Sequence, residues 1–285
     1  MLNKLCIGTA QFGMNYGVNN KIGTVEQNEI EKILDYAYSN GINSLDTAKG
    51  YGQSEDKIGE YIKSREGLWE VTTKISNINH SLEEQLTDSL DKIGCSSLNV
   101  LAHSTKIFFN GSFLNQITCL KKKDFIKKVG LSVYSNDNIE DVYKYADIID
   151  IIQLPLNILD TRLIKNGTLN KLNNLGIEIH ARSIFLQGLL NMKKKQLSND
   201  FINILEPIKS LEKFIEGEDI NIAEYSLLFV SSLDFISKVI IGVETLDQFR
   251  FNINSLKKKV NKTIFKDALS IEFDDEYILN PSLWN

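Results

Sequence analysis

The stretch NSLDTAKGYGQSEDKIGEYI (residues 43–62) contains the transition that decides the fold, from a short apolar strand to a helix. The strand ends at Asp46, and the turn that follows carries Lys49 and Tyr51. Ser54 is expected to cap the helix, because a serine hydroxyl accepts hydrogen bonds from first-turn amides. A carboxylate, an ammonium and a phenol on one tight connection indicate either a solvated turn or the edge of an active site.

The same alternation of strand and helix continues along the chain. Segments with helical spacing and end signals predict helices at residues 24–41, 81–94, 136–146 and 161–176, with Thr24 and Ser81 as caps of the first two. Short apolar segments, several of them rich in β-branched residues, predict strands at residues 5–8, 42–46, 69–75, 98–103, 127–133, 149–154, 177–182 and 238–243.

Eight strands in strict alternation with helices predict a single α/β domain over residues 1–285, a (β/α)8 TIM barrel. A doubly wound open sheet is the alternative. The segment GTAQFG (residues 8–13) after the first strand does not match the GxGxxG pattern of a dinucleotide-binding open sheet, which favours the barrel.

Composition argues against several classes of function. The 285 residues carry a formal net charge of −5, so no nucleic-acid partner is expected. Cys6, Cys95 and Cys119 lie far apart, and no Cys/His cluster predicts a metal site. With no leader-like N-terminus and no apolar run of about 18 residues, we expect a cytoplasmic protein without a membrane partner. No feature of the sequence predicts an oligomeric state.

Active sites of such barrels lie at the carboxyl ends of the strands. Asp46, Lys74 and His103 end three successive predicted strands, so we expect them to meet beside Tyr51. A nearby ammonium lowers the pKa of a phenol from its ordinary value of about 10. Asp46 can hold Lys74 charged and His103 can bond a substrate oxygen, so that Tyr51 protonates a carbonyl oxygen while hydride reaches its carbon.

Three segments carry a family resemblance. DTAKGYGQSE (residues 46–55), TTKI (72–75) and NVLAH (99–103) resemble the catalytic segments of the aldo-keto reductase family, and the spacing resembles its short bacterial members. The resemblance implies a (β/α)8 barrel, a nicotinamide cofactor, and Asp46, Tyr51, Lys74 and His103 as the catalytic residues. The cofactor of this family is usually NADP(H), with NAD(H) as the alternative.

The resemblance also implies cofactor contacts along the rest of the chain. VGLSVYS (129–135) and IIQLPLN (151–157) align with segments that bind the carboxamide, HARSIFLQGLL (180–190) with the pyrophosphate loop, and VIIGVETLDQFRFNI (239–253) with the adenosine end. The cofactor-binding residues expected on this basis are Thr9, Asp46, Ser132, Gln153, Arg182, Ser183, Leu186, Gly188, Gly242, Thr245, Gln248 and Asn252.

The chain departs from the family pattern at two places. Where NADP-specific members place Lys and Arg around the 2′-phosphate, this chain has Gly242 and Gln248, so NAD(H) use stays open. Arg182 stands where the family commonly stacks an aromatic ring on the nicotinamide, and its charge is expected either to favour an anionic substrate or to pair with a carboxylate.

The function expected is reduction of an aldehyde or ketone, with a sugar or sugar-derived carbonyl as the small-molecule substrate. One alternative is a catalytically silent, nucleotide-sensing member of the same barrel family. Another is an isomerase or lyase that uses Lys74 to form a Schiff base.

Two further residues have open roles. Lys49 is expected to be a solvated residue at the rim of the site. The tail that ends near Trp284 is expected either to close the substrate side of the pocket or to be disordered.

Overall fold

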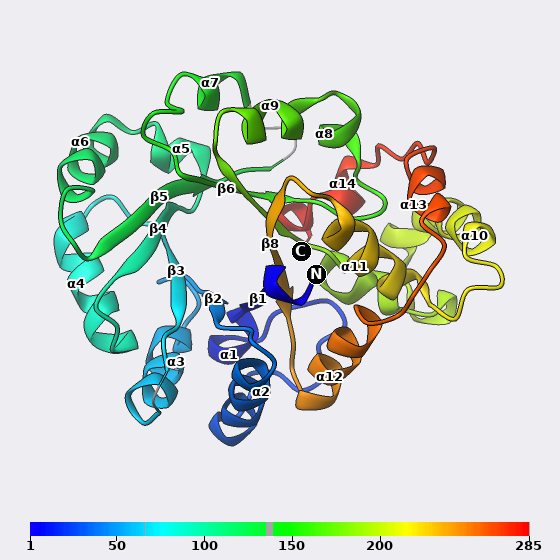
Figure 1. Cartoon of the computed structure of the whole chain (residues 1–285), viewed down its shortest axis with the longest axis horizontal. Coiled ribbons are helices and arrows are strands. Elements are labelled where there is room, and N and C mark those ends of the chain that lie inside the picture. Colours follow the sequence, from blue (N-terminus) through cyan, green and yellow to red (C-terminus); the bar gives the residue numbers. More distant parts are fainter. Residues whose placement is uncertain (66, 135–138, 285) are drawn as a thin grey trace.

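The computed structural model describes residues 1–65, 67–134 and 139–284. Eight parallel strands close into a barrel in sequence order, and helices surround it (Figure 1). The predicted TIM barrel is confirmed, and the open-sheet alternative is wrong. The strands are β1 (Leu5–Gly8), β2 (Ser44–Asp46), β3 (Glu70–Ile75), β4 (Leu98–Ala102), β5 (Ile126–Ser132), β6 (Ile151–Pro155), β7 (Glu178–Arg182) and β8 (Ile236–Gly242).

The helices lie outside the barrel, with α10, α13 and α14 gathered on one side of it (Figure 1). Within the described ranges, none has both the length and the apolar composition that crossing a lipid bilayer requires. The α-helices are α1 (Ala10–Gly13), α2 (Gln27–Ser39), α3 (Ser54–Lys63), α4 (Leu82–Ile93), α5 (Thr105–Phe108), α6 (Gly111–Leu120), α7 (Ile139–Tyr143), α8 (Arg162–Lys165), α9 (Thr168–Asn174), α10 (Leu205–Phe214), α11 (Ile222–Ser232), α12 (Leu246–Ser255), α13 (Thr263–Ala268) and α14 (Glu276–Leu279). The 3-10 helices are η1 (Leu2–Lys4), η2 (Leu186–Asn191), η3 (Lys194–Gln196), η4 (Asn199–Ile204) and η5 (Pro281–Leu283).

Two predicted helix caps have different outcomes. The Oγ of Ser81 accepts from the amide of Glu84 at 3.4 Å, as predicted for α4. Thr24 does not cap α2, because that helix starts at Gln27 after Glu26. The amide of Val25 instead donates to the carbonyl of Gln11 at 2.9 Å. This bond holds the segment before the helix as part of the loop that follows β1.

The helices predicted at residues 136–146 and 161–176 are longer than the helices in the structure. The first three residues of the helix predicted at 136–146 lie outside the described residues, and α7 spans Ile139–Tyr143, so it ends three residues earlier than predicted. Residues 161–176 form two helices instead of one, because the Asn166 side chain accepts from the amide of Thr168 at 3.0 Å and begins α9 anew.

The amino-terminal end of the barrel contains a ring of charged side chains, Glu70, Lys128, Glu178 and Lys238. Glu70 on β3 lies 2.9 Å from Lys238 on β8, and Lys128 on β5 lies 2.7 Å from Glu178 on β7. Burial raises the pKa of Glu70, but the hydrogen bond and charge of Lys238 outweigh it and hold that pKa at about 2. Glu70 is therefore ionised in the folded protein well below the pH at which an unfolded glutamate takes up its proton.

We predict that this ring makes stability depend on acid pH. Because the folded pKa of Glu70 is lowered, its contribution is present above about pH 4.5 and is lost as the pH falls toward 2. Glu70→Gln should cost about 1–2 kcal/mol at pH 6, a figure reduced because the side chain is partly exposed to water. Urea unfolding of both proteins at pH 6 and pH 3.5 measures the difference.

The difference in unfolding free energy between the two proteins should shrink at the lower pH. Glu212→Gln, on the exposed face of α10, is the control and should leave the pH dependence unchanged. A cost of Glu70→Gln that is the same at both pH values would contradict this role for the ring.

Candidate active site

A buried ion pair lies at the carboxyl ends of β2 and β3. The Nζ atom of Lys74 is 2.5 Å from Oδ1 of Asp46, and the Lys74 side chain is only 1% exposed. Lys74 also donates to the carbonyl of Thr47 at 2.9 Å, and the other Asp46 oxygen accepts from Nε2 of Gln153 at 2.7 Å. Both charges therefore have further polar partners, as a buried ion pair requires.

Opposing effects set the pKa of Lys74. Burial lowers it, because the ammonium loses its hydration, while the negative charge of Asp46 and the contact with Tyr51 raise it. The net pKa lies above the ordinary lysine value, so the side chain is an ammonium at neutral pH. Its Nζ atom lies 5.1 Å from the centre of the Tyr51 ring.

Close backbone packing holds the turn that carries Tyr51. A Cβ at Gly13 would lie 1.7 Å from the carbonyl oxygen of Tyr51, so only glycine fits where α1 meets this turn. The same carbonyl accepts from the amide of Ser54 at 3.1 Å. The position of Tyr51 is thereby tied to both α1 and α3.

Ser54 joins the ends of two strands and does not cap its helix. Gln53 is the N-cap of α3. The Oγ of Ser54 lies 2.8 Å from Oγ1 of Thr9 and 2.9 Å from its carbonyl, and it accepts from Thr47 at 3.1 Å. The hydroxyl therefore links the ends of β1 and β2 below the site.

Two other charged residues of the turn contact structure outside the cavity. Lys49, expected to be solvated, pairs with Asp88 of α4 at 2.6 Å. Glu55 is buried and accepts from Thr73 at 2.6 Å and from Ser89 at 3.2 Å. These contacts fasten the turn and α3 to β3 and α4, so neither residue is available to a substrate.

His103 follows β4 and faces the Tyr51 ring. The two rings meet edge to face with their centres 5.9 Å apart. Burial lowers the pKa of His103 most, and the charges of Lys74 and Arg182 lower it further against the opposing effect of Asp46, to about 4. The imidazole is therefore neutral at physiological pH, with one nitrogen donating and the other accepting.

A cavity of about 690 Å³ opens above these residues at the carboxyl ends of the strands. Three predicted residues do not line it: Lys74 lies beneath its floor, Leu186 is fully buried, and Thr245 caps α12. The predicted residues that do line it are Thr9, Asp46, Tyr51, His103, Ser132, Gln153, Arg182, Ser183, Gly188, Gly242, Gln248 and Asn252.

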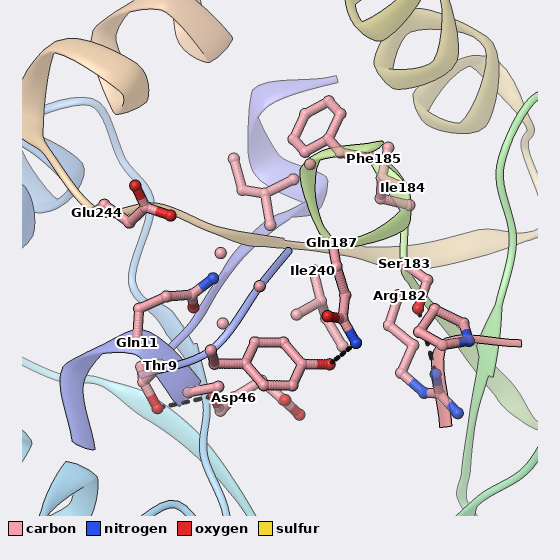
Figure 2. A pocket seen from close by; sticks show the side chains of 18 of the residues that line it. Thr9, Gln11, Asp46, Arg182, Ser183, Ile184, Phe185, Gln187, Ile240 and Glu244 are labelled. Carbon is pink, nitrogen blue, oxygen red and sulfur yellow. Dashed lines mark hydrogen bonds between the residues drawn. The ribbon is translucent and has the colours of Figure 1, made fainter. Parts of the chain in front are cut away.

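The turn after β7 has an unusual backbone. Ser183, Leu186 and Gln187 have φ values of 59°, 47° and 52°, in the left-handed region that residues with side chains rarely adopt. Nε2 of Gln187 donates to the Tyr16 hydroxyl at 3.2 Å, so the loop after β1 meets this turn across the cavity (Figure 2). Such strained backbone is concentrated at ligand-binding sites.

Arg182 is held at the side of the cavity by its neighbours. Its guanidinium lies 4.3 Å from the centre of the Tyr134 ring and donates to the carbonyl of Val133 at 3.0 Å and to the Ser183 hydroxyl at 3.3 Å. The planar group is thus oriented before any ligand binds.

The opposite side of the cavity is built by the end of β8 and the first turns of α12. Figure 2 shows Glu244 and Gln11 there, across the pocket from Arg182 and Ser183. A Cβ at Gly242 would lie 2.7 Å from the Gln11 amide, so glycine keeps this wall open.

Several lining residues were missed by sequence reasoning. Tyr134, Gln187, Glu244, Asp247 and Phe251 all line the cavity. The first four follow a strand on a loop or first helical turn at the carboxyl end of the barrel, and that position is the signal that would have found them. Phe251 lies one turn farther along α12. In the tail, Pro281 and Ser282 line the cavity, whereas Trp284 packs on Phe201 with ring centres 4.8 Å apart.

The lining of the cavity fits a dinucleotide better than a metal centre. It runs from Tyr51 to Asn252 and passes the strained turn at Gly188, where a phosphate can approach backbone amides. Among the residues that the structure describes, no group of three or more His, Cys, Asp or Glu side chains is placed to hold a metal ion.

Comparison with known proteins identifies the family. A sequence profile of the Aldo/keto reductase family matches residues 4–271. The chain is 26% identical to an uncharacterized oxidoreductase, YqkF, of Bacillus subtilis over 262 residues, which are 82% of this chain and 84% of that protein. It is 22% identical to D-arabinose 1-dehydrogenase of Saccharomyces cerevisiae over 279 residues, which are 86% of this chain and 82% of the yeast enzyme.

Solved structures show the same fold. The holo form of the aldo-keto reductase AKR11C1 from Bacillus halodurans superposes with a TM-score of 0.76 at 20% identity, covering 93% of this chain and 91% of that one. A putative aldo-keto reductase from Pseudomonas aeruginosa gives 0.63 at 16% identity, with 89% of each chain covered.

We predict that Lys74→Met destabilises the protein by about 3–5 kcal/mol, because it leaves the Asp46 carboxylate buried without its counter-charge. The double variant Lys74→Met/Asp46→Asn should recover a large part of that loss. Urea unfolding at pH 7 measures both.

Lys49→Met is the matched control, since the Lys49–Asp88 pair is partly exposed and should contribute at most about 1 kcal/mol. If the double variant were as unstable as the sum of its two single variants, the Lys74–Asp46 charges would not be coupled.

Proposed function

The chain belongs to the aldo/keto reductase family of NAD(P)H-dependent oxidoreductases, and from this we propose that it reduces an aldehyde or ketone to an alcohol with Tyr51 as the proton donor. The observation that carries the proposal is the buried Asp46–Lys74 pair beneath Tyr51, with neutral His103 beside it. All of these groups meet at one end of a cavity large enough for a cofactor and a small substrate.

In this proposal the nicotinamide cofactor supplies the hydride when it is bound. Ser132 and Gln153 would hold its carboxamide, and the turn that contains Ser183 and Gly188 would hold its pyrophosphate. The adenosine end would then lie against Gly242 and the start of α12. The choice between NADP(H), which the resemblance favours, and NAD(H) rests on the charges at that end.

In this proposal, residues of the chain donate the proton and stabilise the charge that its transfer creates. The Lys74 ammonium stabilises negative charge on the Tyr51 oxygen, which eases the transfer of its proton to the substrate. Neutral His103 can donate a hydrogen bond to the same substrate oxygen without adding a positive charge that would compete with Lys74.

The two rival functions are less well supported by the site. A Schiff base requires an unprotonated amine, but Asp46 holds the pKa of Lys74 above its ordinary value. A silent nucleotide-binding protein would have no need for a buried ion pair aligned with a tyrosine and a neutral histidine.

A sugar or sugar-derived carbonyl is the substrate class that we propose. The similarity to a protein named D-arabinose 1-dehydrogenase supports it. Near Tyr51 the cavity also offers Tyr16, whose hydroxyl can hydrogen-bond the hydroxyl groups of a sugar. A screen of carbonyl sugars with both nicotinamide cofactors, in both directions, tests this class.

We predict that Tyr51→Phe lowers kcat for carbonyl reduction by about 10²-fold or more, because it removes the proton donor and leaves the packing of the ring. The dissociation constant of the reduced nicotinamide cofactor should change by less than about twofold, since the substitution removes no cofactor contact. Steady-state kinetics and fluorescence titration measure the two effects.

Tyr38→Phe, on the exposed outer face of α2, is the control and should leave both quantities unchanged. Substantial turnover by Tyr51→Phe would exclude the proton-donor role.

A further inference from the structure

The start of α12 closes the cavity opposite Arg182, and its charges are negative. Glu244 and Asp247 line the cavity there. A third carboxylate, Glu29 of α2, reaches the same turn from a distant part of the sequence, with its Oε1 atom 2.8 Å from the amide of Leu246.

Three amides at this helix start already have side-chain partners. Besides Leu246 with Glu29, the amide of Gln248 donates to Oγ1 of Thr245 at 3.2 Å, and the amide of Glu244 donates to Oε1 of Gln248 at 2.8 Å. The Leu246 amide contributes most to holding the pKa of Glu29 below its usual range, so this carboxylate is ionised. The helix amino terminus, ordinarily attractive to a phosphate, thus already holds an anion.

Nearby cations do not face the cavity. Arg250 lies 3.5 Å from Asp247 and rests over the Tyr36 ring, and Lys32 lies 3.3 Å from Glu29. Among the described residues that line the cavity, Arg182 is the only lysine or arginine, and it lies on the other side (Figure 2).

We propose that this end of the cavity selects NAD(H) over NADP(H), with Glu244 as the residue that binds the adenosine ribose and repels a 2′-phosphate. The inference rests on the proposed function, which places the reactive ring at Tyr51 and therefore the adenosine end at α12. A carboxylate accepts hydrogen bonds from the ribose hydroxyls, whereas a phosphate of the same sign next to Glu244 and Asp247 is unfavourable.

Gln248 positions Glu244 for this contact. Its Nε2 atom donates to Oε2 of Glu244 at 3.2 Å, while its Oε1 accepts from the Glu244 amide. Glu244 is thus held at its backbone amide and at its carboxylate before a cofactor binds. Phe251, which is 46% exposed on the same wall, offers a flat ring against which an adenine can stack.

Fluorescence titration of the whole protein with NADH and with NADPH tests the proposal by binding alone. We expect NADH to bind at least about tenfold more tightly than NADPH at low ionic strength. The ratio of the NADPH dissociation constant to the NADH dissociation constant should fall as salt screens the carboxylates. Glu244→Gln should lower this ratio of dissociation constants by improving NADPH binding. Glu244→Lys should reverse the preference, so that NADPH binds more tightly than NADH. Asp247→Asn provides a second variant with a smaller effect in the same direction.

Glu212→Lys makes the same change of charge on the exposed face of α10 and should leave the ratio at its wild-type value. NADPH binding as tight as NADH binding, or a ratio that Glu244→Lys leaves unchanged, would overturn the selectivity and leave the proposed reductase intact. Binding of neither cofactor would overturn the proposed function itself, and the selectivity with it.

Discussion

The buried contact between Lys74 and Asp46 is the constraint on which the site depends. Two opposite charges can remain in a barrel interior only if each is held at hydrogen-bond distance and has further polar partners. Gln153 supplies one of these from β6, so the pair is complete only when the barrel has closed. The β2–β3 register, with Asp46 opposite Thr72, places Lys74 two residues farther toward the cavity, directly below Tyr51.

Most residues of the turn 46–55 support this arrangement from outside the cavity, which only Asp46 and Tyr51 of this turn line. Lys49, expected to be solvated, and Glu55 both contact α4, and Glu55 is buried. Ser54 ties two strand ends together, and Gly13 lets α1 approach the Tyr51 carbonyl. A rigid frame of this kind is what keeps a single phenol in position over a buried ammonium.

The sequence predicted the barrel and the meeting of Asp46, Tyr51, Lys74 and His103 because both follow from local periodicity and from the rule that strand ends face one side. It did not predict contacts between distant segments. Nothing near Glu29 indicates that it binds the Leu246 amide, 217 positions away. Ser54 has the local pattern of a helix cap, and only the approach of Thr9 from β1 gives its hydroxyl a different partner.

The distribution of charge along the cavity separates two tasks. At the proposed reaction end, burial and the positive charges of Lys74 and Arg182 keep His103 neutral, which leaves Tyr51 as the proton donor of the proposed reaction. At the far end, the lining charges are carboxylates, and the amides of Glu244, Leu246 and Gln248 already have side-chain partners. The charges that act on His103 are those of Lys74, Asp46 and Arg182, and none of them comes from α12. If the proposed assignment of the adenosine end to α12 holds, cofactor choice and proton transfer therefore depend on different residues, and substitutions at α12 should alter the first without altering the second.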